Sequence, residues 1–437
     1  MTFLIIFFCI VCLVLLITWG KLNPLLAFLL VSITAGLLLG IPFDKIMGSV
    51  QKGIGDTLGS LVIIIALGAM LGKLVAESGA AQKIAAVMMN AFGIKYVQWA
   101  LVVTGFIIGI PLFYGVGFVL MVPLIFSVVY QYKLPAVYIG LPMLAALSVT
   151  FGFLPPHPSP TALVVQFHAN MGLTLIYGLI LAVPAIIIAG PVYSRALKKI
   201  NSVPLQTFQP PVLSSEHLPG TFTSLLSALL PVMLLMFTTL IPYIVSLPVH
   251  MQQLVAFFAD PGIVMLISLA VATYTLGIKQ GKSMKSVMSI YAEAVKDIAM
   301  ILLIIGSAGA LKQVLTDSGI SQQIATQLNG IQVQPLILAW LIAATIRICV
   351  GSATVAGLTT AGIVAPLITQ THSNPELMVL SIGAGSLAFS HVNDSGFWLF
   401  KEYFNLSIKD TVRSWTAMET IIALVGLGGV LLLNTIV

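Results

Sequence analysis

Charged side chains are scarce in this sequence. Only 7% of its 437 residues are Asp, Glu, Lys or Arg, whereas soluble proteins carry about 25%. Apolar residues make up 59% of the chain, and the mean hydropathy is +1.10. This composition excludes a water-soluble globular protein. It indicates a membrane protein with many spans, because about 20 apolar residues in a helix cross the hydrocarbon of a bilayer.

Residues that form disulfides, metal sites or phosphate loops are also scarce. The three cysteines, Cys9, Cys12 and Cys349, lie in apolar runs and have neither disulfide nor zinc spacing. The six histidines never fall at metal-ligand spacing. The segment GIKQGKS (277–283) is one residue short of a phosphate loop and follows a span instead of a strand. We therefore expect no metal, no cofactor and no ATP-driven step.

Basic residues are scattered between apolar runs, although the formal net charge is +6 and the pI is about 9.1. No basic patch forms, so we expect no nucleic-acid partner. The positive-inside rule places the linker 195–220 in the cytoplasm. Of the 19 Lys and Arg residues, this topology leaves only Lys45, Lys52 and Lys312 outside and Arg347 within the membrane.

Ten apolar runs are expected to cross the membrane as helices: residues 2–19, 22–41, 58–76, 135–151, 173–193, 222–247, 262–278, 298–315, 377–389 and 416–437. Two further stretches, about 97–130 and 335–369, are too long for one span. They are interrupted by GIPLFYGVG (109–117) and GSATVAG (351–357). We expect each to be a re-entrant hairpin.

The two halves of the chain repeat one another. ESGAAQKIA (77–85) aligns with DSGISQQIA (317–325), and each half contains five crossings and one hairpin. The sequence predicts repeat 1 over 1–194, a cytoplasmic linker over 195–220 and repeat 2 over 221–437. The expected fold is an all-α polytopic membrane protein of two inverted repeats with broken helices at the midplane. Many secondary transporters are built this way.

Two more helix breaks are expected at membrane depth, FLPPHPSPT (153–161) and FSHVNDSG (389–396). Prolines forbid a continuous helix in the first break. Irregular backbone is tolerated at this depth only inside protein or beside an aqueous cavity, so the breaks mark candidate sites. Helix N-termini suit a carboxylate, and hydroxyl and amide side chains suit a polyol. The substrate-binding candidates are Tyr114, His157, Ser159, Thr161, Arg347, Ser352, Thr354 and Asn393.

Arg347 is the basic residue that we place inside the bilayer, at a cost of about 2.5–3.5 kcal/mol. It could clamp the carboxylate of an anionic substrate. Alternatively, it forms a structural ion pair or extends to an interface near the base of the hairpin.

Asp394 and His391 are the candidates for proton coupling, because a buried carboxylate beside an imidazole can titrate near physiological pH. Alternatively, Asp394 caps a half-helix and His391 donates to a backbone carbonyl. His157 either touches substrate or is a satisfied polar group. Tyr114, Ser352 and Thr354 belong to the hairpin tips, although hydroxyl side chains in membrane helices often bond only to their own backbone.

Four long motifs resemble the gluconate permease family. They are LGAMLGKLVAESGAAQKIA (67–85), GFLPPHPSPTA (152–162), RICVGSATVAGLTTAGIVAP (347–366) and HVNDSGFWLFKEYFNLSI (391–408). The resemblance covers essentially the whole chain. It implies uptake of gluconate and related sugar acids with protons, and membership of a larger ion-transporter superfamily. It also implies two re-entrant hairpins, a scaffold domain that forms a homodimer, and an elevator-like transport domain.

The chain departs from the family pattern in the first hairpin tip. Family members carry an acidic residue there, in a pattern like F-Y/F-E-V-G-F, whereas this chain has FYGVGF (113–118) with Gly115 at that position. The coupling proton would then be carried by Asp394 or a histidine, or the chain is an uncoupled or altered variant. Ser395 replaces the usual Pro or Ala, a mild change.

The sequence thus predicts a proton-coupled symporter for gluconate-like sugar acids in a bacterial inner membrane. Its expected partners are a small anionic substrate, protons, membrane lipid and a second copy of the chain. A permease for D-serine or another small hydroxy acid is the alternative within this class. An intramembrane enzyme using His391 and Asp394 is disfavoured, because the sequence offers no nucleophile or metal motif. A passive channel would show flux without saturation.

Overall fold

The structure, a computed structural model, describes residues 2–200, 202, 218–245, 248–319, 334–371, 373–392 and 394–437. The regular structure in these ranges is helical, as the composition predicted. The first half contains α1 (Thr2–Thr18), α2 (Pro24–Leu38), α3 (Phe43–Glu77), α4 (Ala80–Phe92), α5 (Val97–Gly109), α6 (Tyr114–Tyr132), α7 (Ala136–Phe153), α8 (Pro158–Gln166) and α9 (Met171–Ile187). The second half contains α10 (Thr221–Ile244), α11 (Val249–Ala259), α12 (Pro261–Ala272), α13 (Met284–Asp317), α15 (Pro335–Val350), α16 (Ala353–Thr371), α17 (Pro375–Gly385), α18 (Ser395–Tyr403), α19 (Ile408–Thr411) and α20 (Ala417–Leu433).

Membrane-spanning helices dominate this architecture. Within the described ranges, 7 helices are long and apolar enough to cross a bilayer. The number rises to 8 if α4 and the helix after it, which meet at 109°, form one span. Several other predicted crossings are shorter apolar helices, among them α2 and α17. The chain is therefore an all-helical polytopic membrane protein, and the exact number of crossings stays a prediction.

The helices α3 and α13 are longer than the sequence predicted. The apolar runs 58–76 and 298–315 form only their second halves, and the first halves are amphipathic. In α3 the buried residues Ile46, Val50 and Gly53 recur at helical spacing. The same spacing recurs in α13 at Val287, Tyr291 and Ala294. These stripes pack inward, and α3 and α13 lie against each other. A search for uninterrupted apolar runs misses such halves because their other face is polar.

The repeated motif occupies the same local structure in both halves. Helix α3 ends at Glu77, and Gly79 follows with φ +80°. Helix α13 ends at Asp317, and Gly319 follows with φ +70°. A glycine in the left-handed conformation commonly ends a helix because it has no Cβ to clash. The remainder of the second motif, 320–325, lies outside the described residues.

All four predicted helix breaks interrupt helices in the structure. Residues 110–113 separate α5 from α6, and residues 351–352 separate α15 from α16. Residues 154–157 separate α7 from α8, which places Pro158 in the first turn of α8, where proline is tolerated. The last break is longer than predicted, because α17 already ends at Gly385. A new helix, α6, α8, α16 or α18, therefore begins after each of the four breaks.

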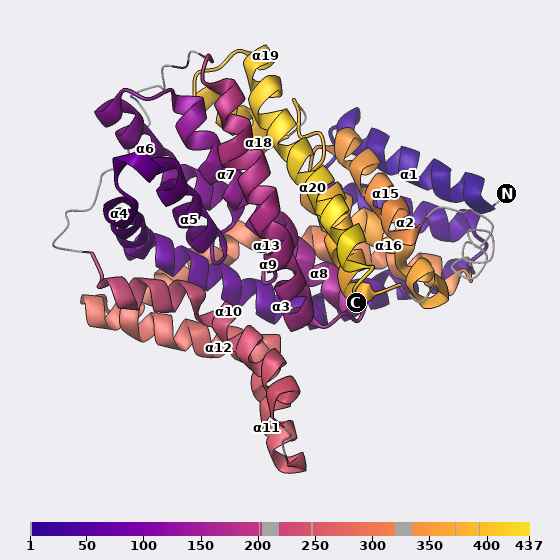
Figure 1. Cartoon of the computed structure of the whole chain (residues 1–437). Coiled ribbons are helices and arrows are strands. Elements are labelled where there is room, and N and C mark those ends of the chain that lie inside the picture. The colour runs from indigo at the N-terminus through magenta and orange to yellow at the C-terminus, as the bar shows by residue number, and fades with distance from the viewer. Residues whose placement is uncertain are drawn as a thin grey trace.

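Helix α7 forms the centre of the protein. Its residues are buried along nearly the whole helix, and it contacts α5, α6 and α9. Helix α20 runs along the front of the molecule beside α9, and α11 protrudes from the lower edge (Figure 1). Because α7 is enclosed on all sides, polar side chains on it face only the protein interior or an internal cavity.

The close contact between α3 and α13 depends on glycine. A Cβ added at Gly53 would lie 2.4 Å from the carbonyl oxygen of Gly309 and 2.8 Å from the Cα of Ala310. We expect Gly53→Ala to destabilise the folded protein by about 1–3 kcal/mol, because the backbone of α13 must shift. Thermal unfolding of the purified protein in detergent measures this loss.

Gly55→Ala is the matched control on the same helix. A Cβ added there meets no described atom within 4 Å, and alanine favours helix over glycine. The unfolding temperature of this variant should hold or rise. Equal destabilisation by the two substitutions would contradict the close packing of α3 on α13.

Candidate functional site

Three helix starts converge on one cavity of about 260 Å³. Its lining includes Tyr114 and Gly115 at the start of α6, Ala353 and Thr354 at the start of α16, and Ser395 at the start of α18. N-terminal N–H groups carry partial positive charge, so each start favours an anion. The N-terminus of α6 has no side-chain cap. The helix breaks therefore direct partial positive charge toward the cavity.

Arg347 supplies a full positive charge to this cavity. It lies in the last turn of α15, and its side chain is only 4% exposed. Its Nη2 donates to Oδ2 of Asp394. Burial of a cation is costly unless a counter-ion is present. The structure thus realises the ion-pair alternative for Arg347, and at the same time places the arginine in a cavity lining.

Asp394 is held by several donors. Its Oδ1 accepts from the backbone N–H of Gly396 at 2.9 Å, so the residue caps α18. Its Oδ2 also accepts from Ser390 Oγ, and Trp415 Nε1 donates to Ser390 Oγ at 2.7 Å. The capping alternative for Asp394 is therefore confirmed. These hydrogen bonds hold the carboxylate of Asp394 in place, and this carboxylate in turn holds the guanidinium of Arg347.

Several polar atoms at the cavity are buried without a hydrogen-bond partner in the described part of the chain. They are Nε and Nη1 of Arg347, Oη of Tyr114 and Oε2 of Glu419. Buried polar groups are normally paired, and exceptions call for an explanation. Two free guanidinium nitrogens beside a free hydroxyl form a ready set of donors for a carboxylate and a neighbouring alcohol.

Glu419 was not predicted from the sequence. It is 2% exposed on α20, and Ser148 Oγ on α7 donates to its Oε1. Both residues line the cavity. The available signal is a single acidic residue inside the apolar run 416–437, which is predicted only as a span. An intramembrane carboxylate is a functional candidate by default.

The structure brings five of the predicted site residues together in the cavity lining: Tyr114, Arg347, Ser352, Thr354 and Asp394. Ser352 Oγ also accepts from the N–H of Val355 at 3.3 Å, as a helix cap does. Asn393 lies outside the described residues. Gly115 lines the cavity, and a Cβ added there would meet no described atom within 4 Å.

The other predicted site residues lie elsewhere. His157 is buried, and its Nε2 lies 2.8 Å from the carbonyl oxygen of Gly109 at the end of α5. His391 Nε2 lies 3.0 Å from the carbonyl oxygen of Ile348. Both histidines thus match the structural alternative of a bond to backbone. Ser159 and Thr161 are buried on α8, with hydroxyls unpaired among the described residues.

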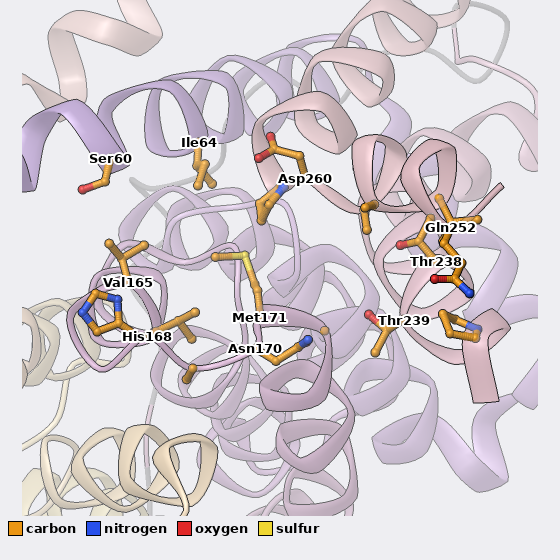
Figure 2. A pocket seen from close by; sticks show the side chains of 18 of the residues that line it. Ser60, Ile64, Val165, His168, Asn170, Met171, Thr238, Thr239, Gln252 and Asp260 are labelled. Carbon is orange, nitrogen blue, oxygen red and sulfur yellow. The ribbon is translucent and has the colours of Figure 1, made fainter. Parts of the chain in front are cut away.

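A larger cavity of about 1060 Å³ lies between α3, the α8–α9 connection and α10–α12. Figure 2 shows Thr238, Thr239 and Gln252 on one side of it and Val165 and His168 on the other. Among the residues that the structure describes, its lining contains no Lys or Arg. The smaller arginine cavity is therefore the better candidate for an anion, although it is not the largest.

The donor set does not suggest a metal. In the parts of the chain that the structure describes, no group of three His, Cys, Asp or Glu side chains is arranged to hold an ion. The arginine cavity instead combines a cation, two carboxyl groups and hydroxyls. Such a set can bind a small hydroxylated anion and exchange a proton.

Comparison with known proteins identifies the family. Residues 1–436 match the family described as GntP family permease. The chain belongs to the GntP permease family. The high-affinity gluconate transporter of Escherichia coli (strain K12) is 48% identical over 429 residues, which cover 98% of each chain. The Gnt-II system L-idonate transporter of that strain is 44% identical over 417 residues and 95% of each chain. The gluconate permease of Bacillus subtilis (strain 168) is 46% identical over 438 residues, with 95% of this chain and 96% of that protein covered.

Solved structures share the fold of this GntP permease at low identity. The YdaH transporter of Alcanivorax borkumensis matches with a TM-score of 0.68 and 16% identity, over 95% of this chain and 98% of its own. MtrF of Neisseria gonorrhoeae matches with a TM-score of 0.64 and 16% identity, over 89% and 83%. The resemblance to gluconate permeases read from the motifs is confirmed. The GntP permease is a membrane transport protein and not an enzyme.

The buried ion pair of the GntP permease generates a stability prediction. Asp394→Asn should destabilise the protein by about 3–5 kcal/mol, because it leaves Arg347 without its counter-ion. Thermal unfolding in detergent without substrate measures the loss. Glu402→Gln is the control, because Glu402 pairs with Lys401 on the same helix but is 57% exposed. We expect a change of at most about 1 kcal/mol there. If Asp394→Asn unfolds at the temperature of Glu402→Gln, the pair does not stabilise the cavity wall.

Proposed function

We propose that this GntP permease takes up gluconate or a related sugar acid together with a proton. The observation that carries the proposal is Arg347, whose Nε and Nη1 are buried at a cavity without a partner among the described residues. Arginine binds carboxylates through paired N–H groups. The substrate carboxylate would occupy these two nitrogens while Nη2 stays on Asp394.

The hydroxyl groups of the substrate have partners nearby. Tyr114, Ser352 and Thr354 line the same cavity, each with a hydroxyl group. The cavity volume of about 260 Å³ is below the about 300–1,000 Å³ of pockets for drug-sized ligands. Such a space suits a small polyhydroxy acid. Asn393, Ser159 and Thr161 stay predicted contacts, and His157 is assigned to the backbone of α5.

The relatives support a sugar acid as the substrate class. Two of them are named for gluconate and one for L-idonate. Gluconate and L-idonate are both six-carbon acids with several hydroxyl groups. D-serine or another small hydroxy acid is the alternative, and competition against uptake of labelled gluconate separates the two. Because Gly115 stands where family members carry an acidic residue, an uncoupled or altered variant is a further alternative.

We further propose that the chain is built from two inverted repeats, 1–194 and 221–437, joined by a cytoplasmic linker over 195–220. Equivalent elements follow one another in the same order in both halves: a long helix, a broken helix pair and a second broken pair. The hairpins would be re-entrant, and the protein would work by alternating access in the inner membrane of a bacterium. An elevator-like motion and a homodimer follow from the family resemblance.

Replacing Arg347 tests the carboxylate site. Arg347→Gln should weaken gluconate binding by more than about tenfold, because a charge-assisted hydrogen bond contributes about 1.5–3 kcal/mol. Isothermal titration of the purified protein measures the affinity, and thermal unfolding shows whether the variant is folded. Arg413→Gln is the control, because Arg413 is exposed on the π-helical turn before α20. Unchanged affinity in a folded Arg347→Gln variant assigns Arg347 to structure alone.

The charge balance of transport gives another prediction. A proton and a monoanion carry no net charge, so uptake should follow an imposed pH difference and respond little to voltage. Membrane vesicles clamped with potassium and valinomycin separate these two driving forces. Uptake that follows voltage and ignores the pH difference rules out one proton per substrate anion.

A further inference from the structure

The two carboxyl groups of the arginine cavity differ in how they are engaged. Asp394 accepts from Arg347, Ser390 and the N–H of Gly396, so both of its oxygens are occupied. Within the described part of the chain, Glu419 accepts from Ser148 alone, through Oε1. Its Oε2 is buried without a partner among the described residues. A proton on Asp394 would disrupt the ion pair with Arg347, whereas a proton on Oε2 of Glu419 disrupts no bond.

Glu419 also lies where its charge acts on the substrate site. It lines the same cavity as Arg347, Asp394 and Tyr114, and it interacts electrostatically with the arginine and the aspartate. Tyr114 reaches the cavity from α6, Arg347 from α15 and Asp394 from the start of α18. From α7 the neighbouring polar group is the uncharged hydroxyl of Ser148. Arg347 is therefore a positive charge that acts on both acids.

The charges of these groups link protonation to anion binding. Arg347 and Asp394 cancel, so an ionised Glu419 leaves the cavity with one negative charge before the substrate enters. An incoming carboxylate would add a second negative charge, and the two negative charges would repel each other. A proton on Glu419 removes this repulsion. Because linkage is reciprocal, bound substrate equally favours the protonated glutamate.

We propose that Glu419 carries the coupling proton, an inference that rests on the proposed symport function. The Oε2 of Glu419 takes a proton from water on the side where the cavity is open, and the substrate carboxylate then binds to Arg347. Both cross together. On the other side the substrate leaves, Glu419 ionises, and the proton returns to water. Asp394 keeps its bonds to Arg347 and Ser390 throughout, and thus has a positioning role.

Glu419→Gln tests this assignment, because glutamine keeps the Oε1 acceptor for Ser148 and cannot ionise. Under an imposed pH difference, the variant should accumulate gluconate to a level about tenfold or more below that of the wild type, in line with coupling between linked sites. It should retain counterflow of labelled gluconate, which needs no net proton movement. Titration of the purified protein over a pH series should show affinity that falls with rising pH in the wild type and stays flat in Glu419→Gln.

Glu376→Gln is the matched control. Glu376 is also a buried glutamate, but it lies on α17 and accepts from the backbone N–H of Asn170, away from the cavity. Its substitution should leave accumulation driven by the pH difference and the pH dependence of affinity as in the wild type. Glu419→Asp, which keeps a carboxyl group, should restore accumulation in part.

The possible outcomes separate this inference from the proposed function. If the wild type neither binds nor accumulates gluconate or a related acid, the proposed function fails. If the wild type does so and Glu419→Gln accumulates substrate equally well under a pH difference, Glu419 is not the carrier. Loss of counterflow together with accumulation in Glu419→Gln, with no rescue by Glu419→Asp, overturns the coupling role and assigns Glu419 to binding or folding.

Discussion

The site depends on keeping one arginine charged inside a membrane protein. Arg347 is buried, and its counter-ion Asp394 comes from a helix break far away in sequence. That carboxylate can be held only because Ser390, Trp415 and the first turn of α18 donate to it or orient its donors. The ion pair therefore requires the break before α18, the packing of α20 and the end of α15 to be in place together.

All the helix breaks of the protein meet the same physical requirement. Backbone groups released from a helix must find partners at membrane depth, because lipid offers none. The starts of α6, α16 and α18 meet this need by gathering around one cavity. The proline-rich break before α8 meets it differently, because His157 reaches back to the end of α5. Breaks that look alike in the sequence thus have two roles. Three of them line the cavity, and the one before α8 bonds to the end of α5.

Much of the fold and part of the candidate site could be predicted from residue patterns. Apolar runs, prolines and glycines located the four breaks, and the rarity of charge singled out Arg347. The pairing of Arg347 with Asp394 could not be predicted, because it depends on how α15 and α18 meet in space. Glu419 was missed since one acid barely lowers the mean hydropathy of a long apolar run. The first halves of α3 and α13 were missed because an amphipathic helix is not an apolar run.

The double engagement of Asp394 has a mechanical consequence. One oxygen holds the first turn of α18 and the other holds the guanidinium on α15. Pulling α15 away from α18 would leave the buried cation of Arg347 without its counter-ion, whereas the cap on α18 would stay in place because Asp394 belongs to the same segment. The bond between Arg347 and Asp394 therefore opposes any separation of α15 from α18 and favours their movement as one unit.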